Sequence, residues 1–69
     1  MTIQELIDQF EIQGAYRIKR WENDLNDYFV FAEGEDFEYE KWDLSETCLN
    51  IKISYMYAID GALHIELEE

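Results

Sequence analysis

The side chains used most often in nucleophilic catalysis are scarce in this chain. His64 is its one histidine and Cys48 its one cysteine, whereas a catalytic triad needs a nucleophile, a base and an orienting acid within reach of one another. The alternation of residue types places His64 on the solvent side of a strand, and Cys48 precedes the hairpin at its opposite end. We interpret His64 as an exposed strand residue and Cys48 as a small buried hydrophobe, and we predict that the protein is not an enzyme.

Carboxylates are plentiful, but their pattern indicates neither catalysis nor metal binding. A glycosidase-type pair needs a cleft that desolvates one of its two acids, and a domain this small has little volume for one. Residues 23–27 offer oxygen ligands without the glycine and the distal glutamate of a calcium loop, and three separate glycines cannot form a phosphate-binding loop. The sequence therefore predicts no cofactor and no metal ion.

One segment, residues 33–46, combines acids with aromatic side chains. It holds seven acids, one base and three aromatic residues. Phe37 to Trp42 alternates as a strand would, and carboxylates at alternate positions of a strand lie about 6.6–6.8 Å apart on one face. Such a row could enter a cationic groove much as a phosphate backbone does, while the aromatic residues supply an apolar anchor. The alternative is a solvated edge strand that its own charges protect from aggregation. The predicted partner-binding residues are Glu33, Glu35, Asp36, Glu38, Tyr39, Glu40, Trp42 and Trp21.

The net charge of −12 restricts the kind of partner. Five basic and seventeen acidic residues repel nucleic acid and anionic membrane surfaces, although such a charge also serves solubility alone. We predict a non-enzymatic acidic protein-interaction module that binds a basic protein surface, without direct contact to nucleic acid or membrane. The alternative is a nucleic-acid mimic that inhibits a DNA- or RNA-handling enzyme, of the anti-restriction or anti-CRISPR type. The sequence is also compatible with a homodimer.

The compartment follows from the cysteine count and from the start of the chain. A single cysteine excludes an internal disulfide framework and fits a reducing compartment. The first residues lack the basic and apolar regions of a signal peptide, and no stretch approaches the roughly 20 apolar residues of a membrane helix. We expect a cytoplasmic protein with one domain, residues 1–69.

The first residues predict a helix that lies on a sheet. Thr2 and Glu5 have the spacing of a capping box. Apolar residues follow at i, i+3, i+4 and i+7, namely Ile3, Leu6, Ile7 and Phe10. About three turns of helix are not stable alone in water, so this apolar stripe has to pack against other elements. Gly14 then offers a place for the chain to reverse.

Four further stretches predict strands. Residues 15–21 and 37–42 alternate, and residues 28–32 are apolar throughout, as in a central strand with both faces covered. Residues 49–67 predict a final β-hairpin. The sum is an α+β fold, with one N-terminal amphipathic helix packed on an antiparallel sheet of four or five strands that ends in a β-hairpin.

The turn of that hairpin decides which side chains share a face. A two-residue Asp60-Gly61 turn would place Met56 opposite Ile65. A three-residue loop that includes Ile59, with a G1 bulge, keeps the alternating apolar residues on one face. We choose the three-residue loop. It predicts the pairs Tyr57–Leu63, Tyr55–Ile65 and Ile53–Leu67, with Lys52 opposite Glu68.

Residues 13–19 (QGAYRIK), 32–37 (AEGEDF) and 55–61 (YMYAIDG) resemble small acidic proteins of unknown function encoded on bacterial mobile elements. The resemblance covers most of the chain and includes no catalytic motif. It implies an accessory or inhibitor role in phage or plasmid biology and assigns no activity.

Overall fold

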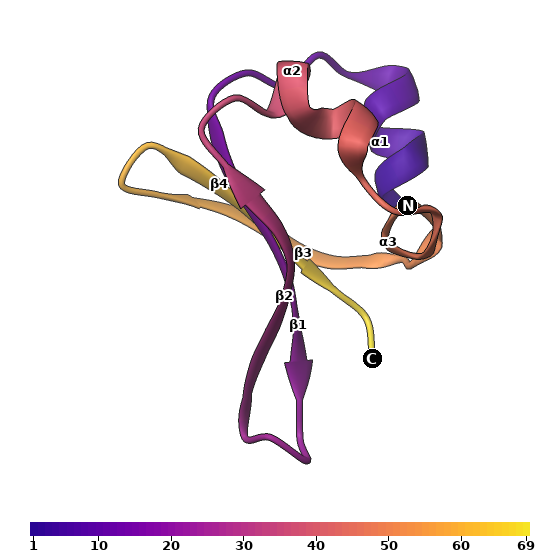
Figure 1. The fold of residues 1–69 in the computed structure, drawn as a ribbon, viewed down its shortest axis with the longest axis vertical. Coiled ribbons are helices and arrows are strands. Elements are labelled where there is room, and N and C mark those ends of the chain that lie inside the picture. The colour runs from indigo at the N-terminus through magenta and orange to yellow at the C-terminus, as the bar shows by residue number, and fades with distance from the viewer.

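The N-terminal helix forms where its capping signals predict it. In the computed structural model, which describes residues 1–69, α1 (Ile3–Gln9) begins after Thr2 (Figure 1). The Thr2 hydroxyl accepts a hydrogen bond from the Glu5 amide (3.2 Å), and the Glu5 carboxylate accepts one from the Thr2 amide (3.1 Å). The capping box is therefore confirmed. The helix is shorter than the predicted three turns, since it has seven residues, and Phe10 lies beyond its end and is 55% exposed. Gly14 reverses the chain after the helix with φ at 96°, a conformation that glycine adopts at little cost.

Four strands form one mixed sheet in the order β2-β1-β4-β3. Their bounds are β1 (Ala15–Glu22), β2 (Asp27–Gly34), β3 (Ile53–Ile59) and β4 (Ala62–Leu67). The hairpins β1–β2 and β3–β4 lie side by side, and β1 and β4 run parallel where the hairpins meet. The prediction of a purely antiparallel sheet is wrong at its centre. Parallel neighbours need a crossover connection, and the helical segment between β2 and β3 belongs to that crossover.

The unbroken apolar run of residues 28–32 does not mark a central strand. β2 is an edge strand, and its first residues lie in the part of the β1–β2 hairpin that projects away from the helices (Figure 1). Phe29 is 47% exposed as a result. Its ring meets the ring of Phe31 edge to face at 4.9 Å. Within this run, only Phe31 and Ala32 pack against the core.

The predicted strand over residues 37–42 is wrong, because this segment is helical. α2 (Phe37–Glu40) continues into a 3-10 turn, η1 (Lys41–Asp43), and α3 (Glu46–Asn50) follows. Asp36 caps α2 by accepting from the Tyr39 amide (3.4 Å), and Ser45 caps α3 by accepting from the Cys48 amide (3.1 Å). α3 also takes in the beginning of the predicted hairpin. The residues of this segment that face the core are Phe37, Lys41, Leu44 and Cys48. They are three or four positions apart, which is the spacing of a helix, and this spacing outweighs the alternation of residue types.

The turn between β3 and β4 has two residues, so the predicted three-residue loop is wrong. Asp60 (φ 51°) and Gly61 (φ 77°) both take the left-handed conformation that two-residue hairpin turns require. An irregularity at Ser54 restores the predicted register on its far side. The predicted pair Ile53–Leu67 forms, and the Glu68 amide donates to the Lys52 carbonyl (2.8 Å), so Lys52 lies opposite Glu68 as predicted. The other pairs are Ile59–Ala62, Ala58–Leu63, Tyr57–His64, Met56–Ile65 and Tyr55–Glu66. The two tyrosines of β3 therefore lie on the face opposite to Ile65.

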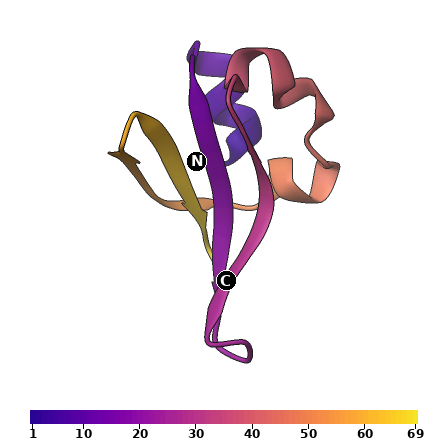
Figure 2. The ribbon, with the colours of Figure 1, turned by 60° about the vertical axis from the view of Figure 1, so that its left-hand side comes forward.

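The helices pack on one face of the sheet and enclose a small core (Figure 2). Cys48 is 1% exposed, which confirms it as a buried hydrophobe. His64 alternates with the buried residues of β4 and lies on the other face, so the sheet separates it from Cys48. None of the helices is both long and apolar enough to cross a membrane. The buried apolar residues are Ile3, Leu6, Tyr16, Ile18, Phe37, Cys48, Ile65 and Leu67.

Candidate functional site

The helical conformation of residues 37–43 leaves two large aromatic side chains in solvent. Tyr39 is 81% exposed and Trp42 is 75% exposed, whereas Phe37 beside them is 1% exposed. Residues three apart share one face of a helical segment, so Tyr39 and Trp42 point outward together while Phe37 packs into the core. Trp42, one of the predicted partner-binding residues, is therefore exposed, although it lies on a helical turn and not on a strand.

Two of the predicted binding acids hold the fold together. Glu38 accepts hydrogen bonds from Lys41 Nζ and from the Ile12 amide (3.3 Å). The hydrogen bond from Lys41 holds the pKa of the Glu38 carboxyl below its usual value. Glu38 therefore ties the helical segment to the chain that follows α1, and it is not a free charge.

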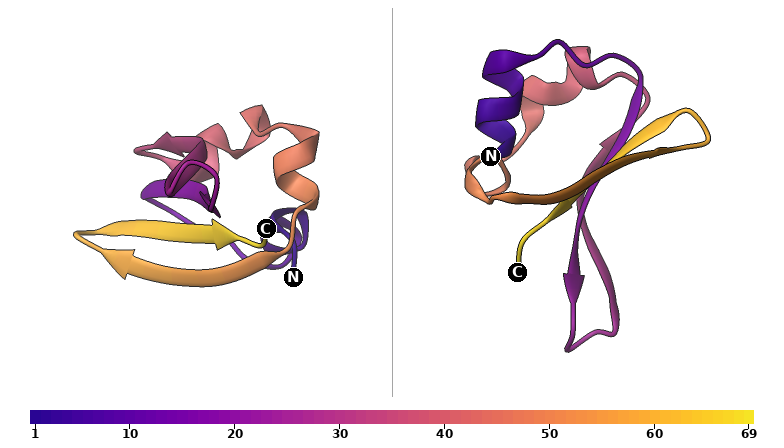
Figure 3. Two further views of the ribbon diagram at one scale, coloured as in Figure 1. Left: turned by 90° about the horizontal axis from the view of Figure 1, so that it is seen from below. Right: turned by 180° about the vertical axis from the view of Figure 1, so that it is seen from behind.

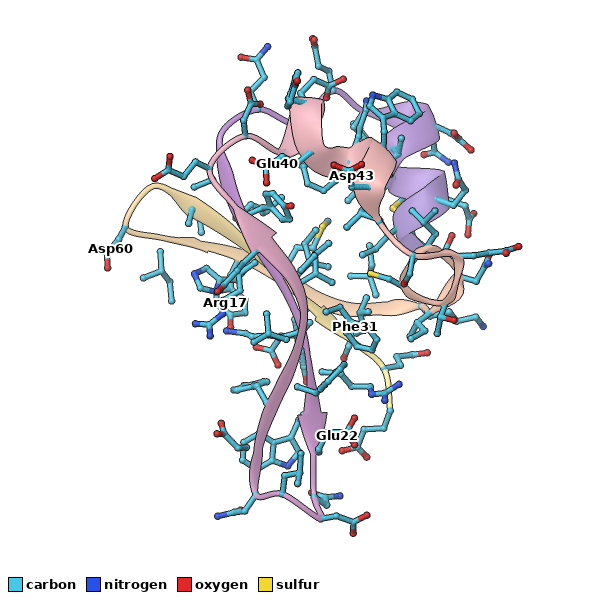
Figure 4. The ribbon with its side chains drawn as sticks, viewed as in Figure 1. Arg17, Glu22, Phe31, Glu40, Asp43 and Asp60 are labelled. Carbon is cyan, nitrogen blue, oxygen red and sulfur yellow. The ribbon has the colours of Figure 1, made fainter.

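Glu40 lies between α2 and the sheet (Figure 4). It accepts from the Tyr16 hydroxyl (3.3 Å) and from the Asp36 amide (3.1 Å). The carboxylate sits where a Cβ atom on Gly34 would stand, since an added Cβ would lie 2.1 Å from Glu40 Oε1. Burial of the Tyr16 phenol, together with the Glu40 charge, raises the Tyr16 pKa. The predicted row of strand carboxylates is thus absent, because Glu38 and Glu40 belong to a helix and both face protein groups.

The remaining acids of the segment differ in how free they are. Glu33 forms an ion pair with Arg17 (3.1 Å), and Asp36 is occupied as the cap of α2. Glu35, Asp43 and Glu46 are exposed and take part in no ion pair. In the whole chain, ion pairs engage three of the seventeen acids, so most of the negative charge stays uncompensated. We call Glu35, Tyr39, Trp42, Asp43 and Glu46 the acidic-aromatic surface.

Trp21 does not join this surface. It lies near the end of β1, next to Glu22 in the part of the hairpin farthest from α2 (Figure 4). Its indole donates to the Asn23 side chain (2.8 Å), and its ring meets Tyr28 edge to face at 5.2 Å. The structure therefore brings the residues predicted from 33–46 onto one segment and separates Trp21 from them.

A cluster that sequence reasoning missed occupies the uncovered face of the sheet. Lys19 is only 8% exposed. Its Nζ lies 3.1 Å from His64 Nδ1, 4.7 Å from the centre of the Tyr28 ring and 5.5 Å from that of Tyr57. An ammonium only donates, so His64 accepts at Nδ1. Lys19 therefore occupies the cation position of this cluster, since its ammonium holds the place that a ligand cation would take in an aromatic cage.

The tyrosines of this cluster are tuned by Glu66. Tyr57 stacks on His64 (5.2 Å between ring centres) and donates to Glu66 Oε2 at 2.6 Å. The hydrogen bond to Glu66 raises the pKa of Tyr57, and burial together with the Glu66 charge raises the pKa of Tyr28. The sequence signal for the cluster was the Asp60-Gly61 turn, because only a two-residue turn places Tyr57 opposite His64.

Known proteins add no assignment to this geometry. Comparison of the chain with protein-family models, curated proteins and solved structures finds no significant match in any of the three. No group of three or more histidine, cysteine or acidic side chains is arranged to hold a metal ion. A function is therefore inferred from the surface residues themselves.

Proposed function

We propose that this protein is a non-enzymatic interaction module that binds a basic protein surface through its acidic-aromatic surface. The observation that carries the proposal is the exposure of Tyr39 and Trp42 (81% and 75%) on a segment where Glu35, Asp43 and Glu46 take part in no ion pair. Tyrosine and tryptophan are the residues enriched at binding hot spots.

The two aromatic side chains supply the affinity in this proposal. Complete burial of the exposed part of each is worth about 3–5 kcal/mol before the costs of association. Lys41 packs its ammonium 4.8 Å from the centre of the Trp42 ring, which holds the indole in place. A side chain that is ordered before binding loses less entropy when the partner covers it.

The acids supply attraction at a distance. Uncompensated negative charge raises the rate of encounter with a cationic surface and makes it dependent on salt. Glu35, Asp43 and Glu46 lie within four residues of Tyr39 or Trp42 in the sequence, and in this proposal they form a polar rim. Rim charges change the association rate more than the final affinity, so the aromatic and acidic substitutions should have different effects.

The test is affinity capture on the immobilised protein from the lysate of its native host, followed by measurement of the dissociation constant for the retained partner. Trp42→Ala should weaken binding by about 30-fold, as expected for a hot-spot loss of about 2 kcal/mol. Leu25→Ala is the matched control, because Leu25 is 65% exposed in the β1–β2 turn. Equal effects of the two substitutions would reject this surface.

The contribution of charge is tested with a second matched pair of variants. Glu35→Gln with Asp43→Asn removes two charges from the proposed surface, and Asp24→Asn with Glu69→Gln removes two exposed charges elsewhere. We expect the first pair to lower the association rate and its salt dependence, and the second pair to have little effect. Glu38 and Glu40 are left unchanged because their substitution would disturb the fold.

The nucleic-acid mimic stays a prediction, but its geometric basis is weaker than the sequence suggested. It rested on a strand of evenly spaced carboxylates, and residues 37–40 form a helix. A mimic would compete with DNA or RNA for the captured partner, with steep salt dependence. Competition of that kind, unaffected by Trp42→Ala, would favour the mimic over an aromatic anchor. The accessory role suggested by the resemblance to mobile-element proteins likewise stays a prediction.

A further inference from the structure

The outer edge of β3 is free along most of its length. β3 is the last strand of the sheet, and only the start of the chain lies beside it (Figure 3). Thr2 pairs with Lys52, and the Ile53 amide donates to the Met1 carbonyl (2.7 Å). From Ser54 to Ile59 the outward backbone groups have no partner strand. Tyr55, Met56 and Ile59 are 65%, 46% and 51% exposed.

This edge lacks the usual protection against pairing. Soluble proteins place charged residues, especially lysine, or proline on their edge strands. A chain with seventeen acids has none between Ile53 and Ile59, where the sequence reads ISYMYAI, and the chain contains no proline. Apolar side chains extend the neutral surface on the helix-bearing face, where a groove is lined by Leu6, Phe10, Glu11, Ile12, Met56 and Leu63.

The sequence of β3 is nearly a palindrome about Met56. Reading outward from that residue gives tyrosine on both sides, then serine or alanine, then isoleucine. An antiparallel pair of identical strands with its two-fold axis at Met56 would match like with like. We infer that β3 pairs with β3 of a second copy of this chain, joining two four-stranded sheets into one of eight strands. This surface is separate from the acidic-aromatic surface, so the inference goes beyond the proposed function.

The backbone of β3 is in the right phase for this pairing. In a hairpin closed by a two-residue turn, the residues that flank the turn form a hydrogen-bonded pair and the pattern then alternates. Ile59 and Tyr57 accordingly direct their amides and carbonyls to β4. Ala58 and Met56 direct theirs outward, so Met56 of each copy would exchange two hydrogen bonds with Met56 of the other.

The side chains of the two copies would continue each surface across the junction. Residues directly opposite in an antiparallel pair lie on the same face. Tyr55 of one copy would stand opposite Tyr57 of the other on the outer face. Met56 of each copy would lie against Met56 of the other on the helix-bearing face, next to the groove that contains Phe10. Half-exposed apolar side chains would thereby lose contact with water.

Charge sets the strength of the dimer and its dependence on salt. The charged residues nearest the neutral run are Lys52 and Asp60, and both lie outside the new pairing because Thr2 already occupies the edge at Lys52. Two chains of net charge −12 nevertheless repel at longer range. Salt screens that repulsion, since the Debye length falls from about 10 Å at 0.1 M to about 3 Å at 1 M. Dimerisation should strengthen with salt, whereas binding to a basic partner should weaken.

The experiment is sedimentation equilibrium of the whole chain over a range of concentrations at about 0.1 M and about 1 M salt. We expect a monomer–dimer equilibrium in the micromolar range, because a single shared strand edge forms a small interface, and we expect more dimer at high salt. Met56→Lys should abolish the dimer by placing two like charges opposite each other. Leu25→Lys changes the net charge equally and should leave the equilibrium intact.

Cross-linking tests the register. Hydrogen-bonded antiparallel pairs have Cα atoms about 5.5 Å apart, within disulfide range, so Met56→Cys should form a dimer on mild oxidation. Ile59→Cys is the matched control, because two copies of that position would lie about 20 Å apart at about 3.3 Å per residue. A monomer at every concentration and salt, a dimer that survives Met56→Lys, or cross-linking of Ile59→Cys alone would overturn the inference. Binding of an extended peptide by a monomer would also overturn it.

Discussion

Substituting Phe37 and Tyr39, which are two residues apart, tests whether residues 37–40 form a helix or a strand. On a strand the two side chains would share a face and would be buried or exposed together. In the structure Phe37 is 1% exposed and Tyr39 is 81% exposed. Replacement of each by leucine keeps an apolar side chain and tests only its surroundings.

The expected loss at Phe37 has two parts. The Phe37 ring meets Tyr16 edge to face, with ring centres 5.1 Å apart and planes at 79°, and such a pair is worth about 0.5–1.5 kcal/mol beyond its buried area. The volume that leucine leaves unfilled adds about 1 kcal/mol. We therefore expect Phe37→Leu to lower the free energy of unfolding by about 1–3 kcal/mol, whereas Tyr39→Leu should stay within about 0.5 kcal/mol.

The assay is thermal and urea unfolding followed by circular dichroism at constant salt. A domain of 69 residues has a total stability of about 3–10 kcal/mol, and 1 kcal/mol shifts its melting temperature by about 4–8 °C. Phe37→Leu should therefore melt about 5–20 °C lower than the unsubstituted protein. Equal losses for the two variants, or a larger loss for Tyr39→Leu, would refute the helical assignment.

Three other predictions concern the outer face, the hairpin turn and the charge. The hydrogen bond to Glu66 raises the pKa of Tyr57 in the folded state. The contribution of this hydrogen bond to stability is therefore complete below the unfolded tyrosine pKa of about 10, and it is lost as the pH rises through the folded pKa. Glu66→Gln should shift part of the alkaline titration, measured by phenolate absorbance, to lower pH. Gly61→Ala should cost about 1–2 kcal/mol in urea unfolding because alanine must then adopt a left-handed conformation, and a neutral result would contradict the two-residue turn. The melting temperature should rise with sodium chloride, since screening relieves repulsion among acids that are mostly unpaired, and a flat curve would show that they are compensated.

Local signals predicted the parts of this fold that depend on neighbouring residues. The capping box of Thr2 and Glu5 needs only two side chains three positions apart, and it forms as predicted. The reversal at Gly14 follows in the same way. The turn at Asp60-Gly61 was readable too, since that dipeptide is the strongest short-range signal of a two-residue hairpin. The predicted three-residue loop followed the amphipathic pattern instead, and the predicted pairs between Ser54 and the turn were therefore wrong.

The candidate surface was predicted in composition but not in geometry. The sequence alone identified an acidic segment that contains Trp42, because charge and residue type do not depend on the fold. The hydrogen bonds that Glu38 and Glu40 accept from protein donors could not be predicted, since they depend on the positions of Ile12, Tyr16 and Asp36 in space. Alternation over six residues fits a strand as well as a helix when caps are overlooked.

The sequence by itself determined the small α+β class, the capped first helix, the final hairpin and the strongly negative surface, because each follows from local pattern or from composition. Tertiary structure alone decided the parallel pairing of β1 with β4, the edge position of β3 and the cluster around Lys19. Pairing between strands so far apart in the chain depends on how the helices cover one face, and no local signal records that. A change of one residue in register exchanges the faces of a strand, so a surface that spans several strands exists only once the sheet has formed.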